Sequence, residues 1–278
     1  MTQPNGTLLV PVANPETVER LLDTAIDLAR DRSLGIVALH VVEVPPQLPL
    51  SEGDRLVGLE EEQLLAAAAD RVAESDVPVE TTLRYARDVA TGIVGAVDAH
   101  DAEALLVGWR GRPRRRDIVL GGFIDRILAG APCDVLVKRI RTETREIESI
   151  LVPVAGGPHT ELAVACAGSI ARQRNASIQL VHVLQSDASA SAKDAAKTLF
   201  EEYAAELPEE IPSVETEIVQ SDHVAGAITD ETSRHDLTVL GASEESTLKR
   251  KLVGSVAEGV GRTAASQVIL TRSGRQID

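Results

Sequence analysis

The sequence predicts an α/β fold made of two tandem copies of a domain, each built on a five-stranded parallel sheet. Two observations support this prediction. Short apolar runs alternate along the chain with one-sided helical stretches, which is the pattern of an open parallel sheet covered by helices. Motifs of the first half then recur in the same order in the second half. With 278 residues, the chain is long enough for two domains of ordinary size.

The first half supplies five expected strands separated by four expected helices. The opening run Thr7–Val12 is short, apolar and rich in β-forming residues, as in a buried strand. Asn14 and Pro15 follow it as an expected N-cap and first-turn proline. We expect strands at Thr7–Val12, Ile36–Val42, Val79–Tyr85, Ala104–Val107 and Val135–Lys138, and helices at Glu16–Arg30, Leu56–Val72, Val89–Ala99 and Gly121–Ala129.

The second half repeats the first. Leu9–Ala13 recurs as Leu151–Ala155, and Leu39–Val41 recurs as Val181–Val183, both at an offset of 142 residues. The recurring letters include proline and histidine as well as apolar residues. We therefore interpret the match as two copies of one domain rather than as chance similarity between apolar strands.

The offset shortens towards the end of each copy. Cys133–Val137 matches Ser266–Leu270 at an offset of 133 residues. The shortening falls mainly where the proline-rich loop Val44–Pro49 gives way to the shorter Gln185–Ala190. We place the domains at residues 1–141 and 148–278, separated by the polar run Arg141–Ile147.

The charge of the chain excludes some partners. A net charge of −15 argues against general binding of nucleic acid or of an anionic membrane, because phosphates would be repelled. Only Lys138, Lys193, Lys197, Lys249 and Lys251 among the 28 basic residues are lysine. Scarce lysine with abundant Asp and Glu resembles proteins of salt-loving organisms, so we expect a halophilic, haloarchaeal source. An acidic protein of a mesophile is the alternative.

The cysteines and the apolar runs bear on the compartment. Cys133 and Cys166 form no spacing motif and are expected to be reduced structural thiols. The first residues lack the basic region and long apolar run of a signal peptide. No segment approaches the roughly 18 uninterrupted apolar residues that a membrane span needs. We therefore expect a cytoplasmic, soluble protein.

The stretch Leu105–Gly122 carries the strongest chemical signal. It reads as an apolar strand ending in glycine, an arginine-dense loop and a glycine pair that opens a helix. Backbone amides at a helix N-terminus beside cationic side chains form an anion site. A phosphate clamp, a docking patch for an acidic partner and a solvated loop paired with Asp and Glu all remain open. The arginines are Arg110, Arg112, Arg114, Arg115 and Arg116, and Lys249, Arg250 and Lys251 lie in the corresponding loop of the second copy.

A repeated β-α unit that opens with LLVPV, continues with LHVV and closes with G-x2-G-x9-G before a helix resembles the universal stress protein family. The resemblance covers nearly all of both copies. It implies a Rossmann-like domain of the adenine nucleotide alpha hydrolase-like kind, a regulatory role in stress, and binding of ATP in some members. It also implies that the last strands, here Asp134–Lys138 and Gln267–Thr271, pair into a pseudo-dimer within one chain, with a further homodimer possible.

The resemblance assigns the nucleotide site most fully to the first copy. Gly108, Gly111, Gly121 and Gly122 keep both glycine spacings of the ATP-binding members, although Gly122 replaces a hydroxyl residue. These glycines would cradle the phosphates of ATP or AMP through backbone amides. Arg110 and Arg112 would supply charge, and the backbone at Val41 would contact adenine.

The second copy departs from the motif elsewhere. Gly241, Gly254 and Ser255 form the weaker set, because Glu244 replaces the second glycine, and Val183 is the expected adenine contact. Both copies lack the Asp that contacts the nucleoside in ATP-binding relatives. Ala13 and Ala155 stand at that position, so we expect a degenerate site that binds nucleotide weakly.

Other functions are kept as alternatives. A regulatory interaction module that binds no nucleotide and acts on a protein partner, such as a membrane transporter, is the first. An enzyme is not expected, since no Gly-x-Ser-x-Gly, Walker, CxxC or HExxH motif is present, but a weak ATPase remains open. The scattered His159, His223 and His235 indicate no metal site. Trp109, His40 and His182 are interpreted as packing or structural residues, with contact to a ligand as the alternative.

Overall fold

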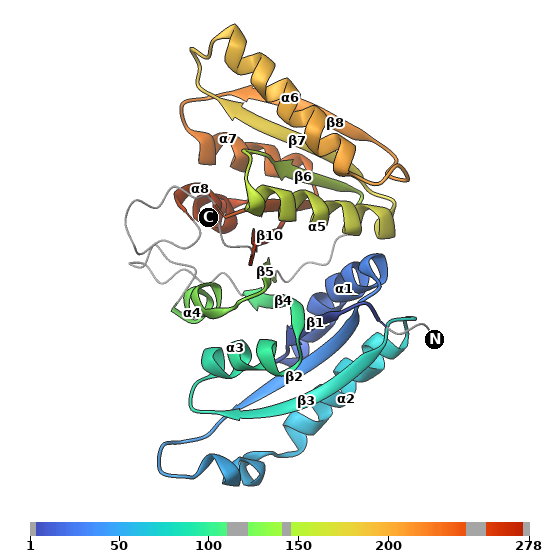
Figure 1. The fold of residues 1–278 in the computed structure, drawn as a ribbon, viewed down its shortest axis with the longest axis vertical. Coiled ribbons are helices and arrows are strands. Elements are labelled where there is room, and N and C mark those ends of the chain that lie inside the picture. Colours follow the sequence, from blue (N-terminus) through green and yellow to red (C-terminus); the bar gives the residue numbers. More distant parts are fainter. Residues whose placement is uncertain (1–3, 110–121, 141–145, 243–253, 275–278) are drawn as a thin grey trace. The chain divides into compact units, whose positions relative to one another are not determined.

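The computed structural model describes residues 4–109, 122–140, 146–242 and 254–274. These residues form two compact units: unit 1 comprises residues 4–109 and 122–140, and unit 2 comprises residues 146–242 and 254–274 (Figure 1). No helix within these ranges is both long enough and apolar enough to cross a membrane. The domain boundary expected near residues 141–148 stays a prediction, because residues 141–145 lie outside the described ranges.

Unit 1 is a parallel sheet with the strand order β3-β2-β1-β4-β5. The predicted α/β fold and the predicted order of elements are confirmed. Its elements are β1 (Thr7–Pro11), α1 (Pro15–Arg32), β2 (Gly35–Glu43), the 3-10 helix η1 (Leu50–Leu56), α2 (Leu59–Ala73), β3 (Val79–Ala86), α3 (Val89–Ala99), β4 (Ala102–Trp109), α4 (Gly122–Gly130) and β5 (Asp134–Arg139).

Unit 2 repeats this architecture with the order β8-β7-β6-β9-β10, also parallel. The predicted tandem repeat is therefore confirmed in three dimensions. Its elements are β6 (Ser149–Pro153), α5 (Pro158–Arg174), β7 (Ser177–Leu184), α6 (Ala190–Glu206), β8 (Val214–Gln220), α7 (Val224–Glu231), the 3-10 helix η2 (Thr232–Arg234), β9 (Leu237–Gly241), α8 (Ser255–Thr263) and β10 (Gln267–Arg272).

The helices of each unit are layered in pairs. In unit 1, α1 packs with α2 and α3 packs with α4; in unit 2, α5 packs with α6 and α7 packs with α8 (Figure 1). Consecutive strand residues point to opposite faces of a sheet. Val41 of β2 lies against Gly92 of α3, so its neighbour His40 points to the α1–α2 face.

One predicted helix begins later than the sequence suggested. The helix expected over Leu56–Val72 begins at Leu59, and residues Leu50–Leu56 form the separate helix η1. Gly58 marks the break, because its backbone N–H donates to the Glu61 carboxylate at 2.8 Å and so caps α2. The proline-marked loop before it hides a short helix that periodicity does not detect.

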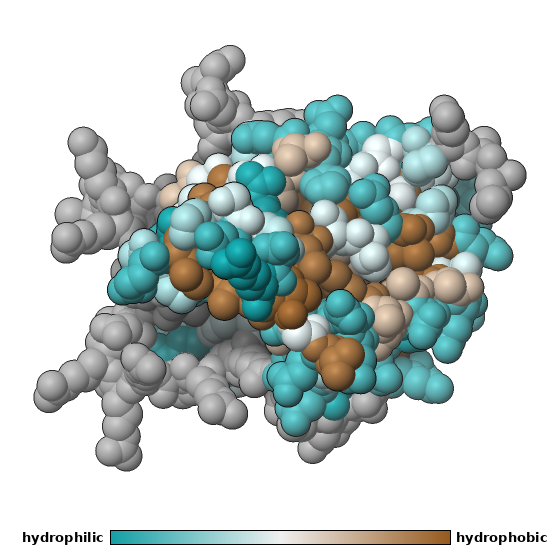
Figure 2. Space-filling view, turned by 90° about the horizontal axis from the view of Figure 1, so that it is seen from below, coloured by the Kyte–Doolittle hydropathy of each residue, from teal (hydrophilic) through white to brown (hydrophobic). Residues whose placement is uncertain are grey.

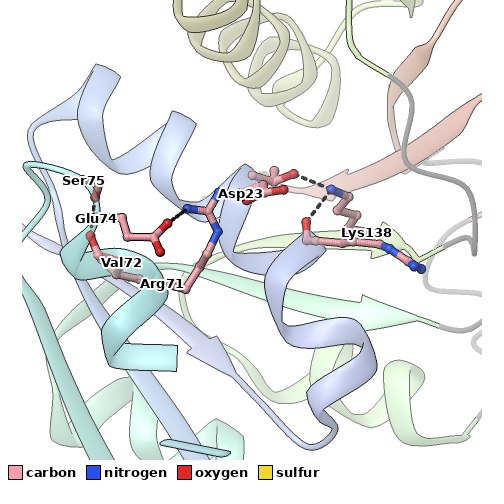
Figure 3. A network of polar contacts seen from close by, with 8 residues as sticks. Asp23, Arg71, Val72, Glu74, Ser75 and Lys138 are labelled. Atoms are coloured by element: carbon pink, nitrogen blue, oxygen red, sulfur yellow. Dashed lines mark hydrogen bonds and ion pairs between the residues drawn. The ribbon is translucent and has the colours of Figure 1, made fainter. Parts of the chain in front are cut away.

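A polar network ties α1 to its neighbours in unit 1 (Figure 3). Arg71 of α2 donates to Asp23 of α1 at 2.5 Å and to Glu74 at 2.8 Å. The buried Lys138 of β5 donates from Nζ to the Arg20 carbonyl at 2.7 Å and to Thr24 Oγ1 at 2.6 Å. These contacts fix α1 against both its neighbouring helix and the last strand of the unit.

Candidate functional site

The carboxyl ends of the parallel strands are the edge at which open α/β sheets bind ligands. Unit 2 has a pocket of about 400 Å³ at this edge. Its floor is formed by the ends of β6, β7 and β9, and its sides come from the start of α5, from α7 and from the start of α8. The lining residues are Pro153, Val154, Ala155, Gly156, Thr160, Val181, His182, Val183, Val224, Ile228, Leu240, Gly241, Ala242, Val256 and Ala257.

The chemistry of this lining is mostly apolar. None of the described residues around the pocket is Asp, Glu, Lys or Arg, and Thr160 supplies the one side-chain hydroxyl. That hydroxyl donates to the Gly156 carbonyl at 2.8 Å. Polar recognition in this part of the pocket therefore falls to backbone groups and to the His182 ring, while Val224, Ile228 and Val256 offer apolar surface suited to a flat ring.

The turn between the first strand and first helix differs between the units. In unit 1, the Asn14 side chain accepts from the Glu16 N–H at 2.8 Å and caps α1. In unit 2, Gly156 and Gly157 have φ angles of +92° and +80°, and no side chain caps α5. Residues other than glycine rarely adopt these φ angles. Because glycine has no side chain, the pair leaves the start of α5 open towards the pocket.

The glycine that ends the fourth strand also has different neighbours in the two units. A Cβ atom at Gly241 would lie 2.6 Å from the backbone carbon of His159 at the start of α5. A Cβ atom at Gly108 would lie 2.5 Å from the tip of the Ile140 side chain and 3.7 Å from Leu21. Helix α5 thus approaches its sheet closely at the pocket, whereas flexible side chains fill the equivalent space in unit 1.

The two strand histidines serve the fold in the same way. Nδ1 of His40 lies 2.8 Å from the Val12 carbonyl oxygen, and Nδ1 of His182 lies 2.7 Å from that of Val154. Because a carbonyl can only accept, both imidazoles carry a proton on Nδ1 and donate it. His40 also contributes to the lowered pKa of Glu61, after the larger effect of the Gly58 N–H. These contacts support the interpretation of both histidines as structural.

The structure places the predicted phosphate-binding residues only in part. Gly108 lies in β4, and Gly122 is the first residue of α4. Gly241 ends β9, Gly254 is the N-cap of α8 with a φ of +74°, and Ser255 begins that helix. The remaining members of the set, Arg110, Gly111, Arg112 and Gly121, lie outside the described residues, as do Arg114, Arg115, Arg116, Glu244 and Lys249–Lys251.

The expected adenine contacts lie at the strand edge. Val183 lines the pocket of unit 2, and Val41 faces α3 in unit 1. Ala155, at the position where the resemblance leads one to expect an Asp, lines the same pocket. Trp109 is the last residue of β4, and its carbonyl accepts from the Ile140 N–H at 2.8 Å. No group of His, Cys, Asp and Glu among the described residues could hold a metal ion.

Sequence reasoning missed two features. The glycine pair Gly156–Gly157 is a readable signal for a turn with positive φ, but the sequence alone does not connect it to a pocket. The pair His100–Asp101 recurs as His235–Asp236 before the fourth strand of each unit. In unit 2, both ring nitrogens of His235 are buried without a hydrogen-bond partner among the described residues. Cys133 and Cys166 are buried thiols.

Comparison with known proteins identifies the family. The model of the universal stress protein family matches residues 4–139 and 146–272. A Na+/H+ antiporter of Synechocystis is 26% identical over 255 residues, which is 91% of this chain but only 36% of the antiporter. A universal stress protein of Mycobacterium bovis is 26% identical over 263 residues, covering 87% of this chain and 88% of that protein.

A solved structure shares the fold over the whole chain. The universal stress protein of Archaeoglobus fulgidus has a TM-score of 0.71 at 16% identity, covering 98% of this chain and 97% of that one. The family model accounts for both units, and the strand order is the same in each. The chain therefore belongs to the universal stress protein family.

Proposed function

We propose that this chain is a regulatory stress-response protein that binds an adenine nucleotide, ATP or AMP, weakly at the strand-end edge of its units. The observation that carries the proposal is the pocket at the ends of β6, β7 and β9. Its volume of about 400 Å³ lies within the range of small-molecule sites, and its position is the ligand-binding edge of open α/β sheets.

The lining suggests how unit 2 would bind the nucleoside part of the ligand. The backbone at Val183 would contact the base, which would lie against Val224 and Ile228 of α7. Helix α8 begins at Ser255 beside this pocket, so its first amides and the Ser255 hydroxyl would meet a phosphate. Binding is weak because Ala155 supplies no carboxylate to hold the ribose.

The proposal also covers how strongly each unit would bind the nucleotide. Glycine spacing and the arginine-rich loop favour unit 1, through Gly108, Gly111, Gly121 and Gly122 with Arg110 and Arg112. The open start of α5 favours unit 2. We propose that unit 1 supplies the stronger phosphate contacts and unit 2 the more open nucleoside pocket.

Calorimetric titration with ATP and AMP, at low and at molar salt, tests this proposal. Restoring the carboxylate with Ala155→Asp should tighten binding about tenfold or more, because a buried hydrogen-bonding partner contributes on the order of 1–3 kcal/mol. Ala13→Asp is the matched variant in unit 1. Ala155→Leu should weaken binding by filling the pocket mouth, while Ala13→Leu should leave unit 2 unaffected. If neither the natural chain nor the Ala155→Asp variant shows a heat of binding at millimolar nucleotide, the proposal that the chain binds nucleotide is wrong.

A second candidate function is control of a membrane transporter by direct contact. This function is favoured because nearly the full chain is similar to one part of a longer protein, the Na+/H+ antiporter of Synechocystis. In this function the arginine-rich loop would dock on an acidic partner. Replacing Arg110, Arg112, Arg114, Arg115 and Arg116 by Ser or Gln should remove the partner in a pull-down from the source cytoplasm. An unchanged set of partners contradicts this docking role.

We propose that the chain is not an enzyme and that it acts in the cytoplasm. Among the described pocket residues, His182 is the one side chain that could act as a general base, its Nδ1 is engaged with the Val154 carbonyl, and no group there could hold a metal ion. A phosphate-release assay with ATP should therefore give the rate of a blank without protein. The pairing of the last strands, Asp134–Lys138 with Gln267–Thr271, and a further homodimer remain predictions from the family resemblance.

A further inference from the structure

The segment from η1 to the first residue of α2 in unit 1 is rich in exposed apolar side chains. Five large apolar residues are exposed in the described ranges, and three of them lie within ten residues of one another: Leu50 at 42%, Leu56 at 37% and Leu59 at 72%. We call these three the leucine surface. Figure 2 views the side of unit 1 formed by α2 and β3 and shows apolar patches between hydrophilic ones. Exposed leucines in one short segment make that segment a candidate interaction surface.

The leucine surface is held in place by the sheet beneath it. Gly53 of η1 packs so closely on Tyr85 that a Cβ atom would lie 2.4 Å from the ring. The Val44 N–H donates to the Ala86 carbonyl at 2.8 Å. Arg87 donates to the carbonyls of Val44 and Pro45 at 3.1 and 2.5 Å. A partner would therefore meet a preformed surface and would not have to order it.

Acidic side chains surround these leucines. Residues 50–62 carry Glu52, Asp54, Glu60, Glu61 and Glu62 against a single basic residue, Arg55. Arg55 is paired with Glu52 at 2.7 Å, and Glu61 accepts from the Gly58 N–H. Asp54, Glu60 and Glu62 are exposed beside the leucines and leave the surface negative. A cationic partner complements it, and an anionic one is repelled.

The fold itself does not require this segment. In unit 2, β7 ends at Leu184 and α6 begins at Ala190, without a 3-10 helix between them. No large apolar side chain is exposed in that connection. The same architecture thus closes with a much shorter loop, so the leucines of unit 1 are not there to complete a core.

From these observations we propose that the leucine surface docks a basic amphipathic helix of a protein partner. The apolar face of such a helix would cover Leu50, Leu56 and Leu59, and its lysines and arginines would meet Asp54, Glu60 and Glu62. Such a helix would present apolar residues at i, i+3, i+4 and i+7 to the leucine surface. This surface lies on the β2–α2 connection of unit 1 and shares no residue with the pocket of unit 2.

Fluorescence anisotropy with a labelled peptide tests the proposal on the full chain. The peptide carries leucines at i, i+3, i+4 and i+7 and lysines elsewhere. We expect the triple variant Leu50→Ser, Leu56→Ser, Leu59→Ser to weaken binding at least tenfold. Phe123→Ser, which changes an exposed apolar residue on α4, should leave the affinity unchanged. Glu60→Gln with Glu62→Gln should weaken binding and flatten its dependence on salt. Circular dichroism checks that each variant is folded.

Four outcomes would overturn the proposal. The triple variant could bind the peptide as tightly as the natural chain. The binding would then come from the general attraction between a basic peptide and an acidic protein. A peptide with glutamate in place of lysine could bind equally well. Sedimentation could show a dimer of the chain that the triple variant abolishes, or phosphatidylcholine vesicles could bind through the leucines; a second copy or a lipid surface would then be the occupant.

Discussion

Units 1 and 2 share a strand order but differ at the edge where a ligand would bind. Each unit anchors its first loop with a histidine, His40 or His182, on the carbonyl that follows a LLVP or ILVP strand. The turn before the first helix is capped by Asn14 in unit 1 and opened by a glycine pair in unit 2. The histidine contact is the same in both units, whereas the turn that follows it differs.

The units also differ inside the sheet. Lys138 of β5 corresponds in the repeat to Thr271 of β10. The lysine crosses to the Arg20 carbonyl and Thr24 of α1, while Thr271 donates to the His159 carbonyl at the start of α5. Each unit thus fastens its first helix to its last strand with a buried polar contact, but at a different turn of the helix. The attachment in unit 2 is next to the pocket.

The largest expected effect is that of Gly241→Ala in unit 2. The new Cβ atom would collide with backbone atoms of His159 and Thr160, so α5 would have to move. Overpacking of this kind should lower the free energy of unfolding by about 3 kcal/mol. The matched Gly108→Ala meets the end of the flexible Ile140 side chain and should cost less. The two variants are compared by urea unfolding, with hydrogen exchange as the readout for each unit. An equal loss of unfolding free energy in both variants would contradict the close approach of α5 to its sheet.

Next in size is the loss expected for Lys138→Met in unit 1. The substitution keeps most of the side-chain volume but removes the ammonium that donates to the Arg20 carbonyl and to the Thr24 hydroxyl. Buried groups that lose a partner should destabilise the unit by about 2 kcal/mol. Trp109, the one tryptophan of the chain, lies in unit 1 and reports this transition by fluorescence. Unchanged stability would mean that packing rather than hydrogen bonding holds α1.

A smaller effect is expected for Asn14→Ala. Removing the N-cap side chain frees the Glu16 N–H and should destabilise α1 by about 1 kcal/mol. Asn14→Ser, which can still accept a hydrogen bond, serves as the control. Urea unfolding monitored at Trp109 measures both variants. A loss as large for serine as for alanine would show that the cap is not the cause.

The smallest expected effect is a difference between the units in how their stability depends on pH. Burial lowers the pKa of His235 below its ordinary value of 6.5, partly offset by Glu231 and Asp236, with Arg234 lowering it further and Glu215 raising it. Below pH 6.5 the unfolded chain therefore takes up a proton more readily than the folded one. The stability of unit 2 should fall as the pH drops through this window towards the lowered pKa.

Hydrogen exchange of unit 2 at neutral and at mildly acidic pH measures this effect. His235→Phe should reduce the acid sensitivity of unit 2. His100→Phe, at the equivalent position of unit 1, should leave it unchanged. If both variants behave alike, the buried ring of His235 is not the titrating group responsible.

Repetition makes most of the fold predictable from sequence. Strong periodicity locates the helix Val89–Ala99 at both ends. The repeated LVPV motif, followed by LHV in one copy and VHV in the other, aligns the two units by their residue types alone. The helix η1 escapes prediction because Pro45, Pro46 and Pro49 indicate a loop, and packing on Tyr85 rather than local propensity holds it. The pocket is predictable only as a set of glycines, because its walls come from α7 and α8, which are distant in sequence from β6.

The histidine contacts have a consequence for the edge at which a ligand would bind. Each ring joins the second strand of its unit to the residue just after the first strand, 28 residues earlier in the chain. The loop that leads into the first helix therefore starts from the same fixed point in both units, although one loop carries Asn14 and the other a glycine pair. A ligand at this edge would meet a rim whose base is set by the sheet and whose outer part differs between the two units.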